Sequence, residues 1–274
     1  MAWLHHKRRH HVTPSAWALL TMAVEDSYAV SGGAVPDPRI LAHWDVLGHL
    51  TAQDTLLLGT LTLSADRVFY GYLLRSLTDP TEYAVVIRGT HGFAEWVIDG
   101  MFAPRQAHPV AGEVESGFYG LAQTLLLDGE PLMSVLPGVV GMGTVTVVGH
   151  SLGAALAQFV AFDLASWRYT TLKLIASPHA GNAVFEAALA ALVTSDSIAW
   201  ASTFDLVTHV PELFGYAAFP NTVILPRNPV GYKINWAPAA QHHCLTYALR
   251  LDPTLDLAAL PACDAAYVAV IWKA

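Results

Sequence analysis

A five-residue stretch in the middle of the chain has the spacing of a serine nucleophile. Residues 149–153 read Gly-His-Ser-Leu-Gly, so a glycine lies two positions to either side of Ser151. A catalytic serine of this kind stands at the tip of a tight strand-to-helix turn, where only small neighbours fit at those two positions. The apolar run 144–148 precedes the stretch and an alanine-rich run follows it. The pattern predicts nucleophilic attack on an acyl group rather than a glycine turn with an inert serine.

The same turn would stabilise negative charge beside the serine. Leu152 would be the first residue of the following helix, where backbone N–H groups have no partner within the helix and the dipole favours an anion. We therefore expect the N–H of Leu152 to form half of an oxyanion hole. His150 should point away from Ser151, and we expect it to pack inside the turn.

The acid that would complete such a site is sought after the serine, because in proteins with this turn the acid and then the base follow it along the chain. Asp205 comes directly after the strand-like run 198–204, whereas Asp196 precedes that run. Functional groups of open parallel sheets lie at the carboxyl ends of strands, which favours Asp205. Asp163 and Glu186 fall within predicted helices, and the aspartates from residue 252 onward leave no histidine after them.

Four histidines follow Ser151 and could supply the base. His179 precedes the acid, and His209 lies only four residues after it on the same loop. His242 and His243 lie late in the chain, just before a predicted helix. One of these two is expected to accept the Ser151 proton while Asp205 fixes its tautomer and stabilises the imidazolium. The residues themselves leave the choice between them open.

The elements that must position these side chains alternate in an α/β pattern. We predict helices over residues 12–30, 115–127, 152–167, 183–193 and 245–251, and strands over 55–63, 67–77, 83–87, 144–148, 172–176, 198–204 and 222–225. Residues 128–143 read as a loop that lies against something apolar. The fold class is α/β, with a mostly parallel central sheet, helices on both faces and antiparallel N-terminal strands.

The chain shows no repeat and no linker, so we expect a single domain over residues 13–274. Residues 1–12 contain the run His-His-Lys-Arg-Arg-His-His and read as a flexible, solvated basic tail. The segment does not resemble a signal peptide, because Pro14 and the acidic pair at 25–26 replace the cleavage region. We therefore expect a cytoplasmic or non-classically exported protein.

Composition excludes several classes of protein. With 54% hydrophobic and 13% charged residues the chain is not disordered, and its longest apolar runs are too short to span a membrane. A net charge of −8 argues against a nucleic-acid partner. Cys244 and Cys263 lack metal-ligand spacing, and the sequence does not decide whether they pair. We expect no metal and no cofactor.

Several segments together resemble the class 3 lipases, the α/β-hydrolase family that includes the fungal triacylglycerol lipases. The resemblance falls in family order over residues 83–247 and rests on residues 85–90 (Val-Val-Ile-Arg-Gly-Thr), 95–99, 116–119, 149–153, 177–182, 204–207, 209–212 and 242–247. It implies a serine carboxylic-ester hydrolase, most simply a triacylglycerol lipase that cleaves apolar acyl esters through an acyl-enzyme.

The resemblance also implies roles for individual residues. Ser151 matches the nucleophile and Asp205 the acid. His242 lies at the family's distance from the Thr-Tyr pair at 246–247, although other members use a shorter spacing that would select His243 instead. Thr90 matches the second donor of the oxyanion hole, through its N–H and its hydroxyl.

Residues just after Thr90 form a candidate lid. Phe93, Trp96 and Val97 recur at the spacing of one apolar helix face, which is usually core, but in the family this segment covers the site and opens at a lipid–water interface. The alternatives are a lidless esterase or phospholipase, or a silent hydrolase fold that binds lipid or protein. The sequence leaves the natural substrate and the oligomeric state open.

Overall fold

The computed structural model describes residues 14–31, 33, 35–53, 67–90, 104–211, 215–228, 231–254 and 271–273. Four of the sequence predictions therefore lie outside the described residues. They are the basic tail over residues 1–12, the strand over 55–63, the candidate lid with Phe93, Trp96 and Val97, and the pairing of Cys263.

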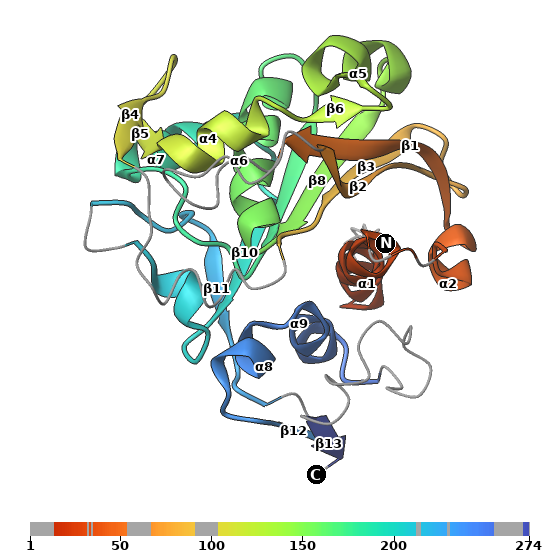
Figure 1. Cartoon of the computed structure of the whole chain (residues 1–274), viewed down its shortest axis with the longest axis vertical. Coiled ribbons are helices and arrows are strands. Elements are labelled where there is room, and N and C mark those ends of the chain that lie inside the picture. Colours follow the sequence, from red (N-terminus) through yellow and green to blue (C-terminus); the bar gives the residue numbers. More distant parts are fainter. Residues whose placement is uncertain are drawn as a thin grey trace, which may run out of the picture.

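A mixed sheet dominates the described part of the chain, with nine strands in the order β11-β10-β9-β8-β3-β2-β1-β6-β7 (Figure 1). Five neighbouring strands run parallel: β3 (Glu82–Ile87), β8 (Thr144–His150), β9 (Thr170–Ile175), β10 (Ile198–Ser202) and β11 (Thr222–Leu225). The others pair antiparallel: β1 (Trp44–Gln53), β2 (Arg67–Ser76), β6 (Leu126–Leu127) and β7 (Glu130–Pro131). The predicted parallel sheet with antiparallel early strands is confirmed.

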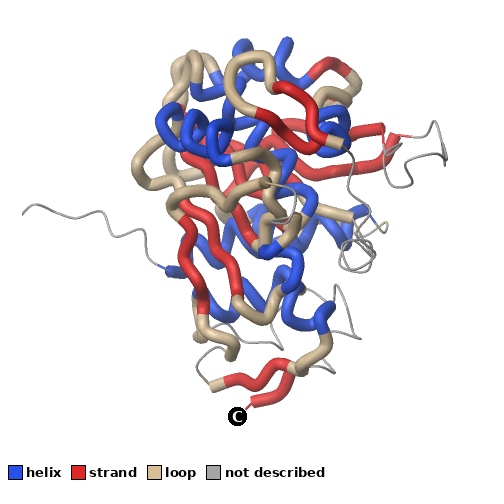
Figure 2. The backbone as a smooth tube through the Cα atoms, turned by 90° about the vertical axis from the view of Figure 1, so that its left-hand side faces the viewer, coloured by secondary structure: helices blue, strands red, loops and turns tan. Residues whose placement is uncertain are grey.

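Helices cover both faces of the sheet. On one face lie α4 (Ser116–Ala122), α5 (Leu132–Val140), α6 (Leu152–Ala165) and α7 (Ala183–Leu192), whereas α1 (Pro14–Ser31) and α9 (Cys244–Leu251) lie together on the other (Figure 1). The short helices α2 (Pro38–Leu41) and α8 (Pro238–His242) and the 3₁₀ turn η1 (Leu206–His209) connect these layers. Two small two-stranded antiparallel sheets, β4 (Arg105–Ala107) with β5 (Glu113–Glu115) and β12 (Tyr232–Ile234) with β13 (Ile271–Lys273), lie outside the main sheet (Figure 2).

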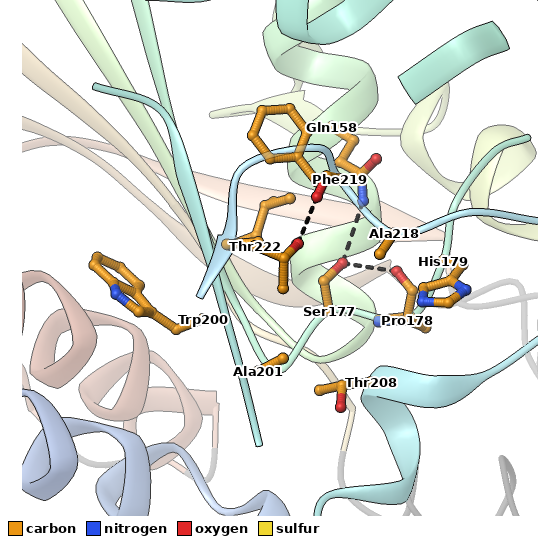
Figure 3. Close-up of a pocket in the computed structure, with 12 residues that line it drawn as sticks. Gln158, Ser177, Pro178, His179, Trp200, Ala201, Thr208, Ala218, Phe219 and Thr222 are labelled. Carbon is orange, nitrogen blue, oxygen red and sulfur yellow. Dashed lines mark hydrogen bonds between the residues drawn. The ribbon is translucent and has the colours of Figure 1, made fainter. Parts of the chain in front are cut away.

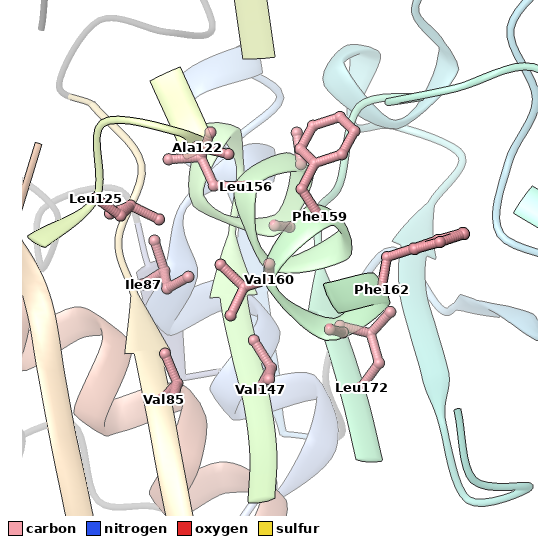
Figure 4. Close-up of a cluster of buried hydrophobic side chains, with 14 of the residues drawn as sticks. Val85, Ile87, Ala122, Leu125, Val147, Leu156, Phe159, Val160, Phe162 and Leu172 are labelled. Atoms are coloured by element: carbon pink, nitrogen blue, oxygen red, sulfur yellow. The ribbon is translucent and has the colours of Figure 1, made fainter. Parts of the chain in front are cut away.

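The central strands bury both of their faces, as parallel strands between two helical layers must. Val85 and Val147 belong to the hydrophobic cluster on the α6 side, where they lie beneath Val160 (Figure 4). Val86 and Val148, one position further along each strand, belong to the cluster formed with α1 and α9. This alternation fixes the strands rigidly, so their carboxyl ends make a firm base for a site.

The structure corrects three predictions about elements. The predicted loop 128–143 contains α5, because Leu132, Leu136 and Val140 lie at intervals of four, share one buried face and outweigh the helix-breaking effect of Pro137. The helix expected over 115–127 ends at Ala122, and residues 126–127 form β6 instead. Strand β1 was not predicted at all.

Candidate active site

The turn between β8 and α6 has a strained backbone at Ser151. This residue has φ 59° and ψ −131°, a backbone conformation that residues other than glycine rarely adopt. Small neighbours make the turn possible: a Cβ on Gly149 would stand 2.2 Å from the carbonyl oxygen of Gly153, and a Cβ on Gly153 would stand 2.4 Å from the carbonyl oxygen of Arg88. The turn therefore has the shape that the glycine spacing predicts, with Ser151 at its tip.

Three side chains from separate segments meet at this turn. His242 Nε2 lies 2.8 Å from Ser151 Oγ, and His242 Nδ1 lies 3.0 Å from each carboxylate oxygen of Asp205. All three residues are buried. A carboxylate accepts, so Nδ1 carries a proton and Nε2 is the nitrogen that can take the serine proton. The arrangement can activate the Ser151 hydroxyl as a nucleophile.

Further donors hold Asp205 in place. The backbone N–H of Val207, at the start of η1, donates to Asp205 Oδ1 at 3.1 Å, and the hydroxyl of Tyr247 donates to Oδ2 at 2.7 Å. Burial, followed by the neighbouring Asp205, raises the pKa of Tyr247 well above 10, so the phenol keeps its proton. No local pattern in the sequence links Tyr247 to Asp205, so this contact was not predicted. The sequence pointed to Tyr247 only through its spacing from His242.

The other histidines after the serine point elsewhere. His243 Nδ1 accepts from the N–H of Leu245 at 3.2 Å and lies 3.8 Å from Glu25 Oε2 of α1. His209 is exposed at the end of η1, and His179 is buried with its backbone bonded to Val210. Of the two histidines that the sequence left open, the structure brings His242 to Ser151.

The end of β3 lies against the serine turn. A Cβ on Gly89 would stand 2.9 Å from Ser151 Cβ, so the next residue, Thr90, follows at the rim of the turn. The hydroxyl of Thr90 is buried and has no hydrogen-bond partner among the described residues. Leu152 is buried at the first position of α6, where the helix itself offers its N–H no acceptor. Leu152 therefore adjoins Ser151 in sequence, and Thr90 lies one residue beyond the contact between Gly89 and Ser151.

The side chain of Arg88 holds the backbone just after β3 in place. Its Nε donates to the Phe69 carbonyl at 2.8 Å and its Nη1 to the Gly89 carbonyl at 2.6 Å. The guanidinium also lies 5.0 Å from the centre of the Tyr70 ring. These contacts fix the backbone that leads into Thr90.

His150 packs inside the turn, as its place beside Ser151 predicted. Its Nδ1 is 2.9 Å from the hydroxyl of Tyr28, and its Nε2 is 2.8 Å from the carbonyl oxygen of His242. The His150 and His242 rings lie 4.8 Å apart. Tyr28 comes from α1, and nothing in the sequence marked it as part of a site.

A small pocket lies beside the Asp205 loop, at the carboxyl ends of β9 and β10 (Figure 3). Ser177, Pro178 and Thr208 are among its lining residues, and its cavity volume of about 20 Å³ has room for a water molecule rather than for a ligand. Its described lining includes none of Ser151, Asp205 and His242. We therefore do not assign it to the reacting groups.

The described residues show neither a membrane-spanning helix nor a cluster of metal ligands. Within the described ranges no helix is both long and apolar enough to cross a membrane. Across the same residues, histidine, cysteine and acidic side chains do not gather in a group of three or more that could hold a metal ion.

Comparison with known proteins adds sequence evidence. The model of the class 3 lipase family matches residues 84–215, which include Thr90, Ser151 and Asp205. A lipase from Rhizopus niveus is 32% identical over 157 residues, covering 53% of this chain and 39% of the relative. A secreted mono- and diacylglycerol lipase A from Penicillium cyclopium is 35% identical over 149 residues, covering 50% and 47%. The matched regions therefore span less than half of either curated relative.

Solved structures show the same fold. Lip2 lipase from Yarrowia lipolytica superposes with a TM-score of 0.64 at 18% identity, covering 78% of this chain and 80% of that one. The M37 lipase gives a TM-score of 0.61 at 17% identity, covering 85% and 92%. The chain has the α/β-hydrolase fold of these structures.

Proposed function

We propose that this chain, whose residues 84–215 belong to the class 3 lipase family, is a serine hydrolase of carboxylic esters. The observation that carries the proposal is the pair of hydrogen bonds that links Asp205 to His242 at 3.0 Å and His242 to Ser151 at 2.8 Å. A buried acid, base and strained serine at the carboxyl ends of parallel strands form the arrangement that acyl transfer requires.

The reaction would proceed in two halves. Ser151 Oγ attacks the ester carbonyl while His242 Nε2 takes its proton, and the N–H groups of Thr90 and Leu152 hold the oxyanion. His242 then returns the proton to the leaving alcohol, which leaves an acyl-enzyme on Ser151. Water, deprotonated by the same histidine, attacks the acyl-enzyme and releases the acid. Asp205 stabilises the imidazolium at both stages.

The substrate class we propose is apolar acyl esters, with triacylglycerols as the first candidate and a lipid–water interface as the place of action. Support comes from the names of the relatives and from three exposed apolar side chains near the triad. Phe204, Leu206 and Trp236 are 39%, 50% and 64% exposed, and we call them the apolar rim. Phe204 and Leu206 flank Asp205, and Trp236 contacts Phe204 with ring centres 5.3 Å apart.

Two further parts of the proposal concern the rest of the chain. Residues 13–274 would form one hydrolase domain, and Phe93, Trp96 and Val97 would form its lid.

The test of the proposed function is covalent labelling of the serine. The full chain is treated with a fluorophosphonate probe and assayed with a soluble short-chain ester. We expect the wild type to label and to turn over, and Ser151→Ala to lose the label and about 10⁴- to 10⁶-fold in kcat. Ser177→Ala is the matched control, since Ser177 also follows a parallel strand, and it should keep both signals. A wild type that neither labels nor hydrolyses, or a Ser151→Ala variant that still does both, would overturn the proposal.

A further inference from the structure

His150 connects two parts of the candidate site that are far apart in sequence. On one side its Nε2 meets the carbonyl oxygen of His242 at 2.8 Å. On the other its Nδ1 meets the hydroxyl of Tyr28 at 2.9 Å, and that hydroxyl lies 2.8 Å from the N–H of Gly89. Gly89 directly precedes Thr90, so the chain of contacts runs from the base to the expected oxyanion hole.

Chemistry decides which atom donates in each hydrogen bond between His242 and Gly89. A carbonyl oxygen only accepts, so His150 Nε2 must carry a proton and donate to His242. A backbone N–H only donates, so Gly89 donates to the oxygen of Tyr28. The Tyr28 hydroxyl donates its own proton to His150 Nδ1, 2.9 Å away. With one proton already on Nε2, the neutral ring has Nδ1 available as an acceptor.

The surroundings of His150 favour this neutral ring. Burial, and after it the neighbouring His242, lowers the pKa of His150 well below its usual value, while its bond to the His242 carbonyl opposes that shift and His243 adds to it. Burial, followed by nearby Cys244, raises the pKa of Tyr28 well above 10, so its hydroxyl also keeps its proton. The centre of the Tyr247 ring lies 6.5 Å from the centre of the His150 ring.

We propose that His150 is a positioning residue for ester hydrolysis: as the Nε2–H tautomer, oriented by Tyr28, it holds the backbone of His242 in register with the strand end that carries Thr90. His242 ends α8 and has no strand to fix it, whereas Ser151 directly follows β8 and Thr90 lies just beyond the end of β3 at Ile87. A hydrogen bond to its carbonyl from the rigid serine turn supplies the missing anchor. This inference rests on the proposed function.

The kinetic test uses variants that break this connection at different points. Tyr28→Phe keeps the ring but removes the hydroxyl, and His150→Phe removes both bonds of the imidazole. We expect kcat for a soluble ester to fall about tenfold and about a hundredfold, with KM changed less than about twofold, because small displacements of a base cost this much. The double variant should be no slower than His150→Phe, since both act through one path. His150→Gln, which has an amide donor and acceptor, should recover part of kcat.

Tyr216→Phe is the matched control. It removes the hydroxyl of another buried tyrosine, one without a hydrogen-bond partner among the described residues. We expect it to keep wild-type kcat. If Tyr28→Phe also keeps wild-type kcat, or if the variants lose kcat only in proportion to their loss of Tm, the positioning role is wrong.

A second measurement reads His150 without any turnover. Nuclear magnetic resonance of the ¹⁵N-histidine-labelled full chain at neutral pH should show His150 protonated at Nε2 and bare at Nδ1. A proton on Nδ1, or on both nitrogens, would overturn the inference even in an active enzyme. The expected tautomer in a chain that hydrolyses no ester would instead remove the proposed function and leave the hydrogen-bond geometry standing.

Discussion

Asp205 accepts hydrogen bonds from three residues on three different elements. His242 reaches it from α8, Tyr247 from α9 and the N–H of Val207 from η1. A fully buried carboxylate is costly unless its lone pairs are matched by donors, and this one has a partner at both oxygens. The site therefore presents to His242 an acid whose position is fixed before any substrate arrives.

The side chains of His242 and His243 point in different directions. This difference gives a prediction for single residues. His242→Ala removes the side chain at 2.8 Å from Ser151 and should lower kcat about 10⁴-fold or more. His243→Ala removes a cap of α9, so it should cost about 1 kcal/mol of stability and keep kcat within about tenfold. Steady-state kinetics on a soluble ester and thermal unfolding of both variants check this. The reverse ranking of kcat would move the base to His243.

Sequence reasoning reached Ser151 and Asp205 because each follows directly from a local rule. Glycines at fixed spacing mark the serine turn, and the end of a strand marks the acid. The local pattern did not choose between His242 and His243, and only the family spacing favoured His242. The backbone at the α8–α9 junction, with φ −58° and ψ 138° at His243, decides where each side chain points. Tyr28 joins the site from more than a hundred residues away, and no pattern in the sequence records such a contact.

At the scale of elements, α6 and α7 enclose a carboxyl group between them. Glu186 of α7 is 1% exposed, and burial raises its pKa well above its usual 4.5, opposed by a hydrogen bond from the backbone of Gly181. Gln158 of α6 faces it: with the amide nitrogen toward Glu186, the two carboxylate oxygens lie at 2.8 and 3.1 Å. The two helices thus pack around an acid that resists ionisation.

A pH dependence of stability follows from this packing. The unfolded chain ionises Glu186 freely near pH 4.5, while the folded chain resists until its raised pKa is reached. Stability is therefore fully present below about pH 4.5 and falls as pH rises through this interval. Glu186→Gln should remove that decline and gain about 1 kcal/mol at pH 8, which is within the range of single stabilising substitutions.

Denaturant unfolding of the wild type and the variant between pH 4 and pH 8 measures this difference. Glu82→Gln is the control, because Glu82 is exposed at the start of β3, and its curve should parallel the wild type. Parallel curves for Glu186→Gln and the wild type would contradict the raised pKa.

Elements themselves were predicted where one period dominates. The apolar run before Ser151 and the alanine-rich helix after it gave β8 and α6 with small errors at the ends. Strand β1 was missed because Gly48, His49 and Thr51 break its apolar pattern. It pairs with β2 along its length and with β6 at Leu50 and Thr51. Tertiary pairing decided this element, and local sequence did not.

On the scale of the whole molecule, exposed apolar side chains lie at both ends of the parallel strands, but the triad lies at one end alone. The apolar rim lies beside the triad at the carboxyl ends of the parallel strands, whereas Tyr169, which is 65% exposed, lies at the opposite end, just before β9. A lipid aggregate that contacts the rim would meet the site directly. The opposite end also exposes apolar side chains, with Met142 at 89%, but it has no triad beside them, so Tyr169 provides a comparison.

This asymmetry gives a test of lipase against esterase. With a long-chain ester, the rate should rise sharply as its concentration passes the solubility limit. Trp236→Ala should lower the rate on the emulsion about tenfold, the order of burying one large apolar side chain, and leave the soluble-ester rate unchanged. Tyr169→Ala should change neither rate. Smooth saturation below the limit would favour an esterase, and equal losses in both variants would deny the rim its role.

The distance along the chain between Ser151 and its partners has a consequence for synthesis. The base follows the nucleophile by 91 residues, and Tyr247 comes later still. At about 5–20 residues per second, a ribosome needs roughly 5 to 20 s to extend the chain from one to the other. During that interval the nascent protein contains Ser151 but not yet the histidine that we propose activates it. The order of translation thus delays the proposed activation of Ser151 until His242 has been added.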